Sequence, residues 1–361
     1  MAGSTIGKIL RLTVFGESHG ASVGAVLDGF PANFEIDLEY IQNQLDRRKP
    51  GFSALTSPRK EADKVRILSG VFEGKTTGTP ITFLIENTNH QSKDYDALKE
   101  VYRPSHADYS YEKKYGIRDH RGGGRSSARI TAGMVAAGAL TEVLLKQYNI
   151  QIFAYVSSIY DVNLSKKHTE INNADIDKNE LRCPDETIAR QMKQAIEKAK
   201  ADGDSLGGII TCVVRNCPAG LGEPIFDKLQ ADLAKAMMNI NAVKGFEYGN
   251  GFEATKLKGS ENNDFYQKTD KNTTTNSNYS GGIVGGISNG EDIFFRVAFK
   301  PVSSISKAQN MLDKNGNMQE IKIEGRHDAC VVPRAVPIVE SLCKLVISDH
   351  LLCQQIHKIN H

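Results

Sequence analysis

The stretch from Arg118 to Ala132, RDHRGGGRSSARITA, concentrates residue types that bind anions, with four arginines, three consecutive glycines and two serines. The apolar run that follows has helical character, so Ser126 or Ser127 is expected to cap the start of a helix. A helix start directs free backbone N–H groups and the positive end of its dipole toward any ligand that binds beside the glycine run. Arg125 and Arg129 are four residues apart, which predicts a shared helix face, and their planar guanidinium groups suit carboxylates and phosphates. The stretch therefore predicts an anion site.

Two other interpretations of this stretch need no anionic ligand. A run of arginines and glycines can be a disordered tail that binds nucleic acid, and a glycine run can be a turn before a helix. Such tails are low in complexity and lack a following apolar helix. A turn does not require four arginines. The anion site is favoured, and the plain turn remains open.

No global charge directs this chain of 361 residues to nucleic acid or to a membrane, because 45 Lys and Arg stand against 43 Asp and Glu. Hydrophobic residues make up 40% of the chain and charged residues 24%, as in globular proteins with a sizeable core. The first residues show no apolar run with a cleavage site, and no stretch approaches the ~18 apolar residues of a membrane span. We therefore expect a soluble cytoplasmic protein that binds neither nucleic acid nor membranes.

The six cysteines, at 183, 212, 217, 330, 343 and 353, form no C-x-x-C pair and have no histidine at metal-ligand spacing. A chain of this length without a secretion signal is expected to keep its thiols reduced and mostly buried. We expect neither disulfides nor a metal site.

The elements that must position these residues do not alternate regularly between strand and helix, which favours an α+β fold over a doubly wound one. A hairpin of strands 7–15 and 22–30 is expected to present Ser18 and His19 in its turn. Ser105 and Asp108 have capping-box spacing, which predicts a helix entry with His106 in the first turn. The polar run 260–280 has too little apolar content to pack and is expected to be a mobile loop. Further strands are predicted at 65–68, 81–85, 150–159, 208–215, 293–299 and 321–323, and helices at 37–49, 126–149, 188–203, 226–237 and 333–352.

Several segments in collinear order resemble the chorismate synthase family. The most specific are GESHG at 16–20, RPSHADY at 103–109, RDHRGGGRSSAR at 118–129 and GRHD at 325–328. LDRRKPG, AGLGEP, INAVKG, GGIVGGISNG and KPVSSI resemble the family too, so the resemblance spans almost the whole chain. It implies one domain over 1–361, an α+β sandwich of helices layered between antiparallel sheets, usually assembled as a homotetramer.

The resemblance also implies an activity, the seventh step of the shikimate pathway, which leads to the aromatic amino acids. In that step a carbon–oxygen lyase performs an anti-1,4-elimination of phosphate from 5-enolpyruvylshikimate 3-phosphate and gives chorismate. Reduced FMN (FMNH2) is required, although no net redox change occurs. The substrate carries two carboxylates and a phosphate, and FMN adds a phosphate, so such a site needs many fixed cations.

Single residues take roles from the same resemblance. His19 is implied to protonate the reduced flavin, His106 to assist the departure of phosphate, and Asp328 to help deprotonate flavin N5. Ser18 and Ser127 would act as relays. Substrate contacts are implied for Arg48, Arg103 and Arg129. Flavin contacts are implied for Arg125, Ser126, Ser127, Asn241, Ala242, Gly285, Lys300, Pro301, Val302, Ser303, Ser304 and Arg326.

Structural roles remain open for several of these residues. Arg48, in the last turn of a predicted helix, would complement the helix dipole. Asp328 would form a salt bridge with Arg326. Each histidine taken alone would more often be a turn or capping residue, although an unperturbed pKa of roughly 6.5 suits proton transfer near neutral pH.

The sequence departs from the usual family pattern at four positions. Ile130 and Met134 replace a common glutamate and arginine, Ala329 replaces a common proline, and Ala54 replaces a frequent arginine. Loss of the arginine at 134 is expected to weaken anion binding.

Two alternative functions come from other classes. The arginines alone would suit a phosphate-binding module without catalysis, but such a module needs neither the histidines nor Asp328. A flavin oxidoreductase that turns over NADPH is the second alternative. The run Gly281–Gly286 does not match the dinucleotide fingerprint, and we expect a separate flavin reductase to supply the electrons.

Overall fold

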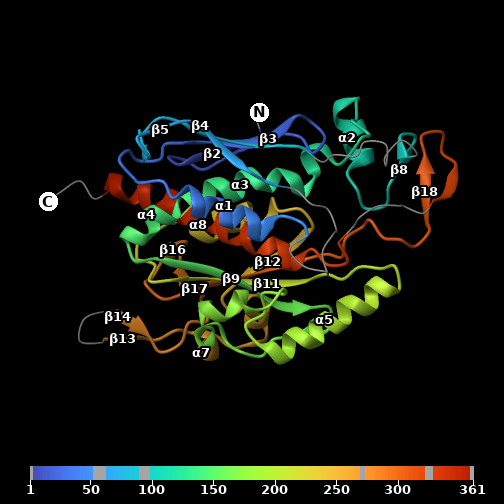
Figure 1. Cartoon of the computed structure of the whole chain (residues 1–361). Coiled ribbons are helices and arrows are strands. Elements are labelled where there is room, and N and C mark those ends of the chain that lie inside the picture. Colours follow the sequence, from blue (N-terminus) through green and yellow to red (C-terminus); the bar gives the residue numbers. More distant parts are fainter. Residues whose placement is uncertain (1–2, 52–61, 89–97, 269–272, 322–327, 358–361) are drawn as a thin grey trace.

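Two antiparallel five-stranded sheets enclose a layer of helices (Figure 1). The computed structural model describes residues 3–51, 62–88, 98–268, 273–321 and 328–357. The upper sheet in Figure 1 has the strand order β1-β2-β3-β7-β4, and the lower sheet has the order β10-β9-β11-β17-β12. The predicted α+β sandwich with helices between antiparallel sheets is confirmed.

Five strands form each main sheet, and shorter hairpins lie around them. The upper sheet contains β1 (Thr5–Ile6), β2 (Arg11–Gly16), β3 (Ser22–Asp28), β4 (Val65–Ser69) and β7 (Ile81–Glu86). The lower sheet contains β9 (Gln151–Ile159), β10 (Val162–Asn163), β11 (Gly208–Arg215), β12 (Val243–Tyr248) and β17 (Ile293–Phe299). The hairpins are β5 (Val71–Phe72) with β6 (Lys75–Thr76), β13 (Tyr266–Lys268) with β14 (Thr273–Thr275), and β15 (Ile283–Val284) with β16 (Ile287–Ser288).

The helices fall into an inner and an outer group. The inner layer holds α1 (Leu38–Arg48), α3 (Thr131–Leu140), α4 (Glu142–Gln147), α6 (Leu229–Met238) and α8 (Val332–His357). Outside the lower sheet lie α5 (Glu186–Ala201) and α7 (Gly259–Asn262). At one end of the sandwich, α2 (Asp108–Tyr115) lies near a third sheet of β8 (Val101–Tyr102), β18 (Gln309–Asp313) and β19 (Met318–Ile321).

Local sequence accounts for the best-predicted elements. The Asp37 carboxylate accepts a hydrogen bond from the Tyr40 backbone N–H, so it caps α1 as expected, and Ile41 and Leu45 face the core. Strands β9 and β11 are buried almost continuously, because α8 covers one face of the lower sheet and α5 the other.

Helix α3 is the centre of the inner layer, and two glycines let it approach its neighbours closely. A Cβ added at Gly133 would lie 2.7 Å from the Gly24 backbone of β3. A Cβ added at Gly138 would lie 2.5 Å from the Ser341 carbonyl oxygen of α8. These contacts bring α3 close to both the upper sheet and α8.

The prediction of one continuous helix over 126–149 is wrong. The region contains 3₁₀ turns at Gly124–Ser126 and Ala128–Ile130, followed by α3 and then α4. Ser127 does act as a cap, because its hydroxyl accepts a hydrogen bond from the Arg129 backbone N–H, but it caps the second 3₁₀ turn. Its extended backbone separates the two turns.

Two other local predictions also differ from the structure. The helix expected from 226 begins at Leu229, and the Phe226 side chain is 91% exposed. The polar run 260–280 contains the end of α7 and the hairpin of β13 and β14. Asp264 organises this run by accepting hydrogen bonds from the backbone and hydroxyl of Ser280. Mobility of the run in solution remains a prediction.

The second 3₁₀ turn, α3 and α4 together form a helical segment, Ala128–Gln147, that is long and apolar enough to cross a membrane by length and composition, contrary to the expectation from the sequence. Its most apolar window is 78% buried inside the protein, and it packs between β3 and α8, as a core helix does. The six cysteines are free thiols, and five of them are buried.

Replacing Gly138 with alanine should destabilise the protein, although alanine favours helices. The added methyl group would overlap the Ser341 backbone, and overpacking of this kind typically costs ~1–3 kcal/mol. The melting temperature, measured by calorimetry, should fall for Gly138→Ala. Gly259→Ala is the matched control, since a Cβ at Gly259 meets no atom within 4 Å. Equal melting temperatures for the two variants would refute the close-packing explanation.

Candidate functional site

The turn between β2 and β3 carries Ser18 and His19, as predicted. Two neighbours hold this turn in place. The Asn87 amide donates hydrogen bonds of 2.8 Å and 2.9 Å to the Glu17 and Gly20 carbonyl oxygens. The Ser18 hydroxyl oxygen is buried, and within the described part of the chain it has no hydrogen-bond partner. It is therefore available to a ligand.

Gly122 lies directly against the imidazole of His19. A Cβ added at Gly122 would lie 2.3 Å from His19 Cδ2 and 2.6 Å from Nε2. The first glycine of the RGGG run is therefore required for close approach to this histidine.

Arg125 and Arg129 do not share a helix face, which corrects the prediction from their spacing. They lie on separate 3₁₀ turns, and Ser127 between them has φ −77° and ψ 143°. The Arg125 guanidinium donates hydrogen bonds of 3.0 Å and 2.8 Å to the carbonyl oxygens of Gly16 and Val14. Arg125 thus supports the end of β2 and the turn that follows it.

Arg129 instead meets Arg48 at one buried carboxylate, that of Asp63. Both guanidinium groups form ion pairs with Asp63, whose side chain is 0% exposed. Arg129 Nε also donates a 2.8 Å hydrogen bond to Asn87 Oδ1. Burial opposes ionisation of Asp63, but the charges of Arg48 and Arg129 hold its pKa below the usual range.

Arg103 forms a second arrangement of this kind. Its guanidinium donates two hydrogen bonds of 2.8 Å to the Asp108 carboxylate, and Arg118 lies 3.3 Å from the same carboxylate. The predicted capping box is therefore wrong, because Asp108 binds arginine and α2 has no side-chain cap. Burial opposes ionisation, and the hydrogen bonds from Arg103 keep the pKa of Asp108 low.

His106 lies just before α2, and both of its ring nitrogens have partners. Nδ1 is 2.9 Å from the Pro104 carbonyl oxygen, which can only accept, so Nδ1 carries a proton. Nε2 is 2.9 Å from the Ser304 hydroxyl, which donates to it when the ring is neutral. Burial lowers the pKa of His106 below its usual value, and the charge of Arg103 adds to this effect.

The segment Lys300–Ser304 and the pair Asn241–Ala242 form one wall of the site. The Lys300 backbone N–H donates a 2.9 Å hydrogen bond to the Ala242 carbonyl oxygen. The Asn241 amide donates a 2.6 Å hydrogen bond to the Ser126 carbonyl oxygen, while its own Oδ1 is buried without a partner among the described residues. Burial lowers the pKa of Lys300, and the like charge of Lys244 lowers it further.

The remaining residues of the segment from Lys300 have local partners. Lys300 Nζ bonds the Ser303 hydroxyl and lies 3.3 Å from the Pro301 carbonyl oxygen. The Val302 carbonyl oxygen accepts a 2.7 Å hydrogen bond from Ser205. The backbone of the segment is thus fixed from both sides.

Asp328 forms an ion pair with Arg334. Arg334 Nε also donates a 3.3 Å hydrogen bond to the Arg48 carbonyl oxygen. One arginine therefore connects Asp328 to the end of α1, where Arg48 lies. The alternative partner, Arg326, lies outside the described residues.

Hydrogen bonds, ion pairs and the contact of Gly122 with His19 thus join most of the predicted residues into a few connected groups. Gly285 is an exception. It lies in the hairpin of β15 and β16 beside the start of α6, whereas Asn241 follows the end of that helix. The ten residues of α6 separate the two positions by ~15 Å along the helix axis. Ala54 lies outside the described residues, so its effect on the site stays a prediction.

Sequence reasoning missed four residues that organise the site: Asp63, Asn87, Arg118 and Arg334. Arg118 belongs to a quoted motif but received no role. Asp63 lies outside every motif, and its charge becomes informative only when the fold places two arginines beside it. Met134, expected to affect anion binding, is buried in the main core next to Ile130.

A family pattern, related sequences and a solved structure all point to one family. The sequence pattern of the family described as "Chorismate synthase" matches residues 10–352. The chain is 55% identical to a chorismate synthase of Christiangramia forsetii over 359 residues, which covers 99% of this chain and 100% of that protein. It is 54% identical to one of Phocaeicola vulgatus, covering 97% and 98% of the two chains. A crystal structure of chorismate synthase superposes with a TM-score of 0.78 at 33% identity, covering 97% of this chain and 93% of the other. The chain therefore belongs to the chorismate synthase family, lyases of the shikimate pathway.

Proposed function

We propose that this protein converts 5-enolpyruvylshikimate 3-phosphate to chorismate by anti-1,4-elimination of phosphate, with reduced FMN bound in the same site. The observation that carries the proposal is the linked arrangement of arginines with His106 and Asp328. A binding module without catalysis would need only the arginines.

Each of the two arginine clusters would bind one of the substrate's three anionic groups. Arg48 and Arg129 share Asp63, and this trio keeps one net positive charge. Arg103 and Arg118 share Asp108 in the same way. Guanidinium groups held by such pairing bind carboxylates or phosphates in fixed orientations, because little side-chain freedom remains to be lost.

The residues present also fit FMN. Ser18 Oγ and Asn241 Oδ1 are buried polar atoms without partners among the described residues, and a flavin ring carries both donors and acceptors. Lys300 and Lys244 are close enough to lower the pKa of Lys300, so an anionic phosphate would stabilise both charges. Ser126, Ser127, Asn241, Ala242 and the segment from Lys300 to Ser304 would hold the group. Reduced FMN, when bound, supplies an electron-rich ring beside the reacting substrate without net redox change.

His106 would act on the leaving phosphate. In the free protein it is neutral, with its proton on Nδ1. A phosphate dianion bound nearby favours the imidazolium form, which can donate from Nε2 to a phosphate oxygen. This hydrogen bond strengthens as negative charge builds up on the departing phosphate. It therefore stabilises the transition state more than the bound substrate, and so accelerates the reaction.

Asp328 and His19 would act on the protons of the bound flavin: His19 would protonate the reduced ring, and Asp328 would help to deprotonate N5. The ion pair with Arg334 fixes the position of the Asp328 carboxylate, which would accept a proton, and Ser18 and Ser127 would act as relays. The absence of a side chain at Gly122 leaves the space that the ring of His19 occupies. The proposal further includes a homotetramer in the cytoplasm, supplied with reduced FMN by a separate flavin reductase.

The function is tested by measuring chorismate formation without oxygen. Chorismate should form with dithionite-reduced FMN, and should not form when FMN is omitted. NADPH should not be oxidised by the protein when it replaces dithionite. Chorismate formation without flavin, or steady NADPH oxidation, would contradict the proposal.

The pH dependence should reveal the protonation state of His106. Because burial lowers its pKa, the imidazolium is lost below pH 6.5 in the free protein, and kcat/KM should fall as the pH rises through that lowered value. A bound phosphate favours the imidazolium form of His106, so the fall of kcat with rising pH should occur at higher pH than the fall of kcat/KM. His106→Asn should remove this limb and lower kcat by ~10²–10⁴-fold. His168→Asn, at a histidine stacked on Phe294, is the control and should keep the profile. A parental limb that persists in His106→Asn would exclude this role.

Gly122→Ala should impair turnover by displacing His19. A double-mutant cycle tests the mechanism, because the added methyl group should matter only while the imidazole is present. Gly122→Ala should lower kcat by ~10-fold or more in the parent, a fraction of the ~10²–10⁴-fold effect of general acid–base catalysis. In a His19→Ala background it should have little further effect. Equal losses in both backgrounds would show that Gly122 acts independently of His19.

A further inference from the structure

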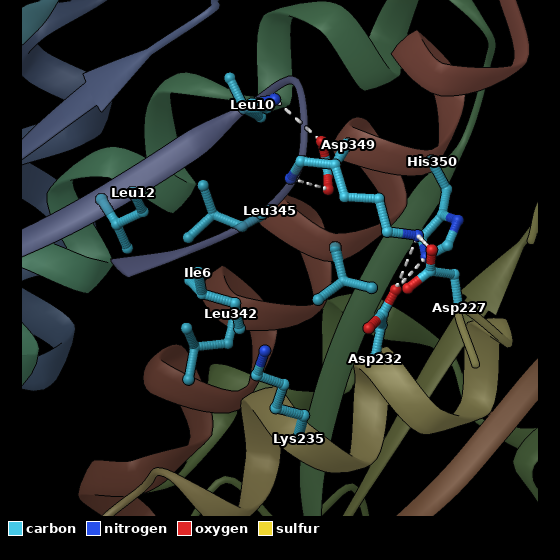
Figure 2. Close-up of a pocket in the computed structure, with 13 residues that line it drawn as sticks. Ile6, Leu10, Leu12, Asp227, Asp232, Lys235, Leu342, Leu345, Asp349 and His350 are labelled. Atoms are coloured by element: carbon cyan, nitrogen blue, oxygen red, sulfur yellow. Dashed lines mark hydrogen bonds and ion pairs between the residues drawn. The ribbon is translucent and has the colours of Figure 1, made fainter. Parts of the chain in front are cut away.

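A cavity lies between the turn that joins β1 to β2, helix α6 and the carboxyl-terminal half of α8 (Figure 2). Its volume is about 140 Å³. None of the residues implied in catalysis, flavin binding or substrate binding lines it.

One side of this cavity is apolar. Its lining includes Leu10, Leu12, Leu342, Leu345 and Val346, all buried residues of the main core, with Ile6 beside them. A cavity of about 150 Å³ lined by leucine, isoleucine and phenylalanine side chains is known to hold one benzene ring. The whole cavity therefore has about the volume of a single aromatic ring, and the charged groups of a ligand would lie at its exposed edge beside Asp227.

The opposite side carries charges of both signs. Asp227 and Asp232 form ion pairs of 3.3 Å and 3.4 Å with Lys8, and His350 lies 2.9 Å from Asp232. The Asp227 side chain is still 53% exposed, so its carboxylate has room for another donor.

Lys235 is the second cation of the cavity wall. It lies three residues after Asp232 on α6, so the two side chains are neighbours on one helix face. Figure 2 shows its ammonium group directed toward Leu342 and Ile6, over the apolar side. Lys235 has no carboxylate partner among the residues that the structure describes.

The cavity wall is held rigid. Asp349 of α8 accepts hydrogen bonds of 2.8, 2.9 and 2.8 Å from the backbone N–H groups of Lys8, Ile9 and Leu10. Figure 2 shows the bond to Leu10 crossing from the helix to the turn. A pre-formed cavity loses little free energy to ordering when a ligand enters.

We propose that this cavity binds a free amino acid with an aromatic side chain. The ring would occupy the apolar side, the α-carboxylate would bind Lys235, and the α-ammonium would bind Asp227 and Asp232. A purely apolar ligand would leave these charges unused, and a ligand with one charge would satisfy only one sign. The cavity is separate from the proposed active site, so the inference stands or fails independently of the reaction.

Calorimetric titration of the whole protein with L-phenylalanine tests the proposal. Saturable binding is expected at millimolar concentrations or below, and it should weaken by ~10-fold or more for 3-phenylpropanoate, for phenethylamine and for L-alanine. These probes lack the ammonium, the carboxylate and the ring respectively. A charge-assisted hydrogen bond typically contributes enough for such a tenfold loss.

Two lysine variants locate the binding. Lys235→Gln should weaken phenylalanine binding by ~10-fold or more, while Lys198→Gln, at an exposed position on α5, should leave it unchanged. Both variants should melt as the parent does, since both lysines are exposed. The proposal is overturned by absence of saturable binding in the parent, by equal affinity in Lys235→Gln, or by phenethylamine binding as tightly as phenylalanine.

Discussion

The buried carboxylate of Asp63 is the interaction on which the rest of the site depends. Two guanidinium groups from distant parts of the chain meet at it, one at the end of α1 and one before α3. Two like charges in a region of low dielectric would repel strongly without a shared anion between them. From Arg129 the contacts continue through Asn87 to the turn of His19, and from Arg48 through Arg334 to Asp328. The same carboxylate therefore connects two arginines proposed to bind the substrate with the turn of His19 and with Asp328.

The site divides its cations between two different tasks. The carboxylates of Asp63 and Asp108 neutralise part of the charge of the arginines around them. The same ion pairs hold the guanidinium groups in fixed positions. Lys300 and Lys244 are near each other, and their repulsion contributes to the lowered pKa of Lys300. The wall formed by Lys300 and Asn241 therefore carries positive potential from two lysines. An anionic cofactor would gain most there, whereas the arginine clusters favour oriented recognition.

The sequence was most informative where local physics decides the outcome. Hydrophobic periodicity located the central strands, and capping chemistry located the start of α1. The spacing of Arg125 and Arg129 predicted a shared face only on the assumption of an α-helix. In the structure the two residues lie on separate 3₁₀ turns, and the extended residue between the turns directs their side chains apart. The roles of Asp63, Asn87 and Arg334 depend on residues far away in the chain. No local pattern marks such residues, and only the packed fold brings their partners together.

Two departures from the family pattern, Ile130 and Met134, lie next to the site in the sequence but belong to the hydrophobic core in the structure. Ile130 and Met134 replace a common glutamate and arginine, and both lie buried one helical turn apart. A buried ion pair costs desolvation on both sides, so its replacement by two apolar residues is often neutral or stabilising. Met134 packs within the main core and outside the clusters at Asp63 and Asp108, and the expected effect of the missing arginine on anion binding stays a prediction. Losing only one partner of a buried pair would leave an unpaired charge, whereas Ile130 and Met134 together place no charge in this part of the core.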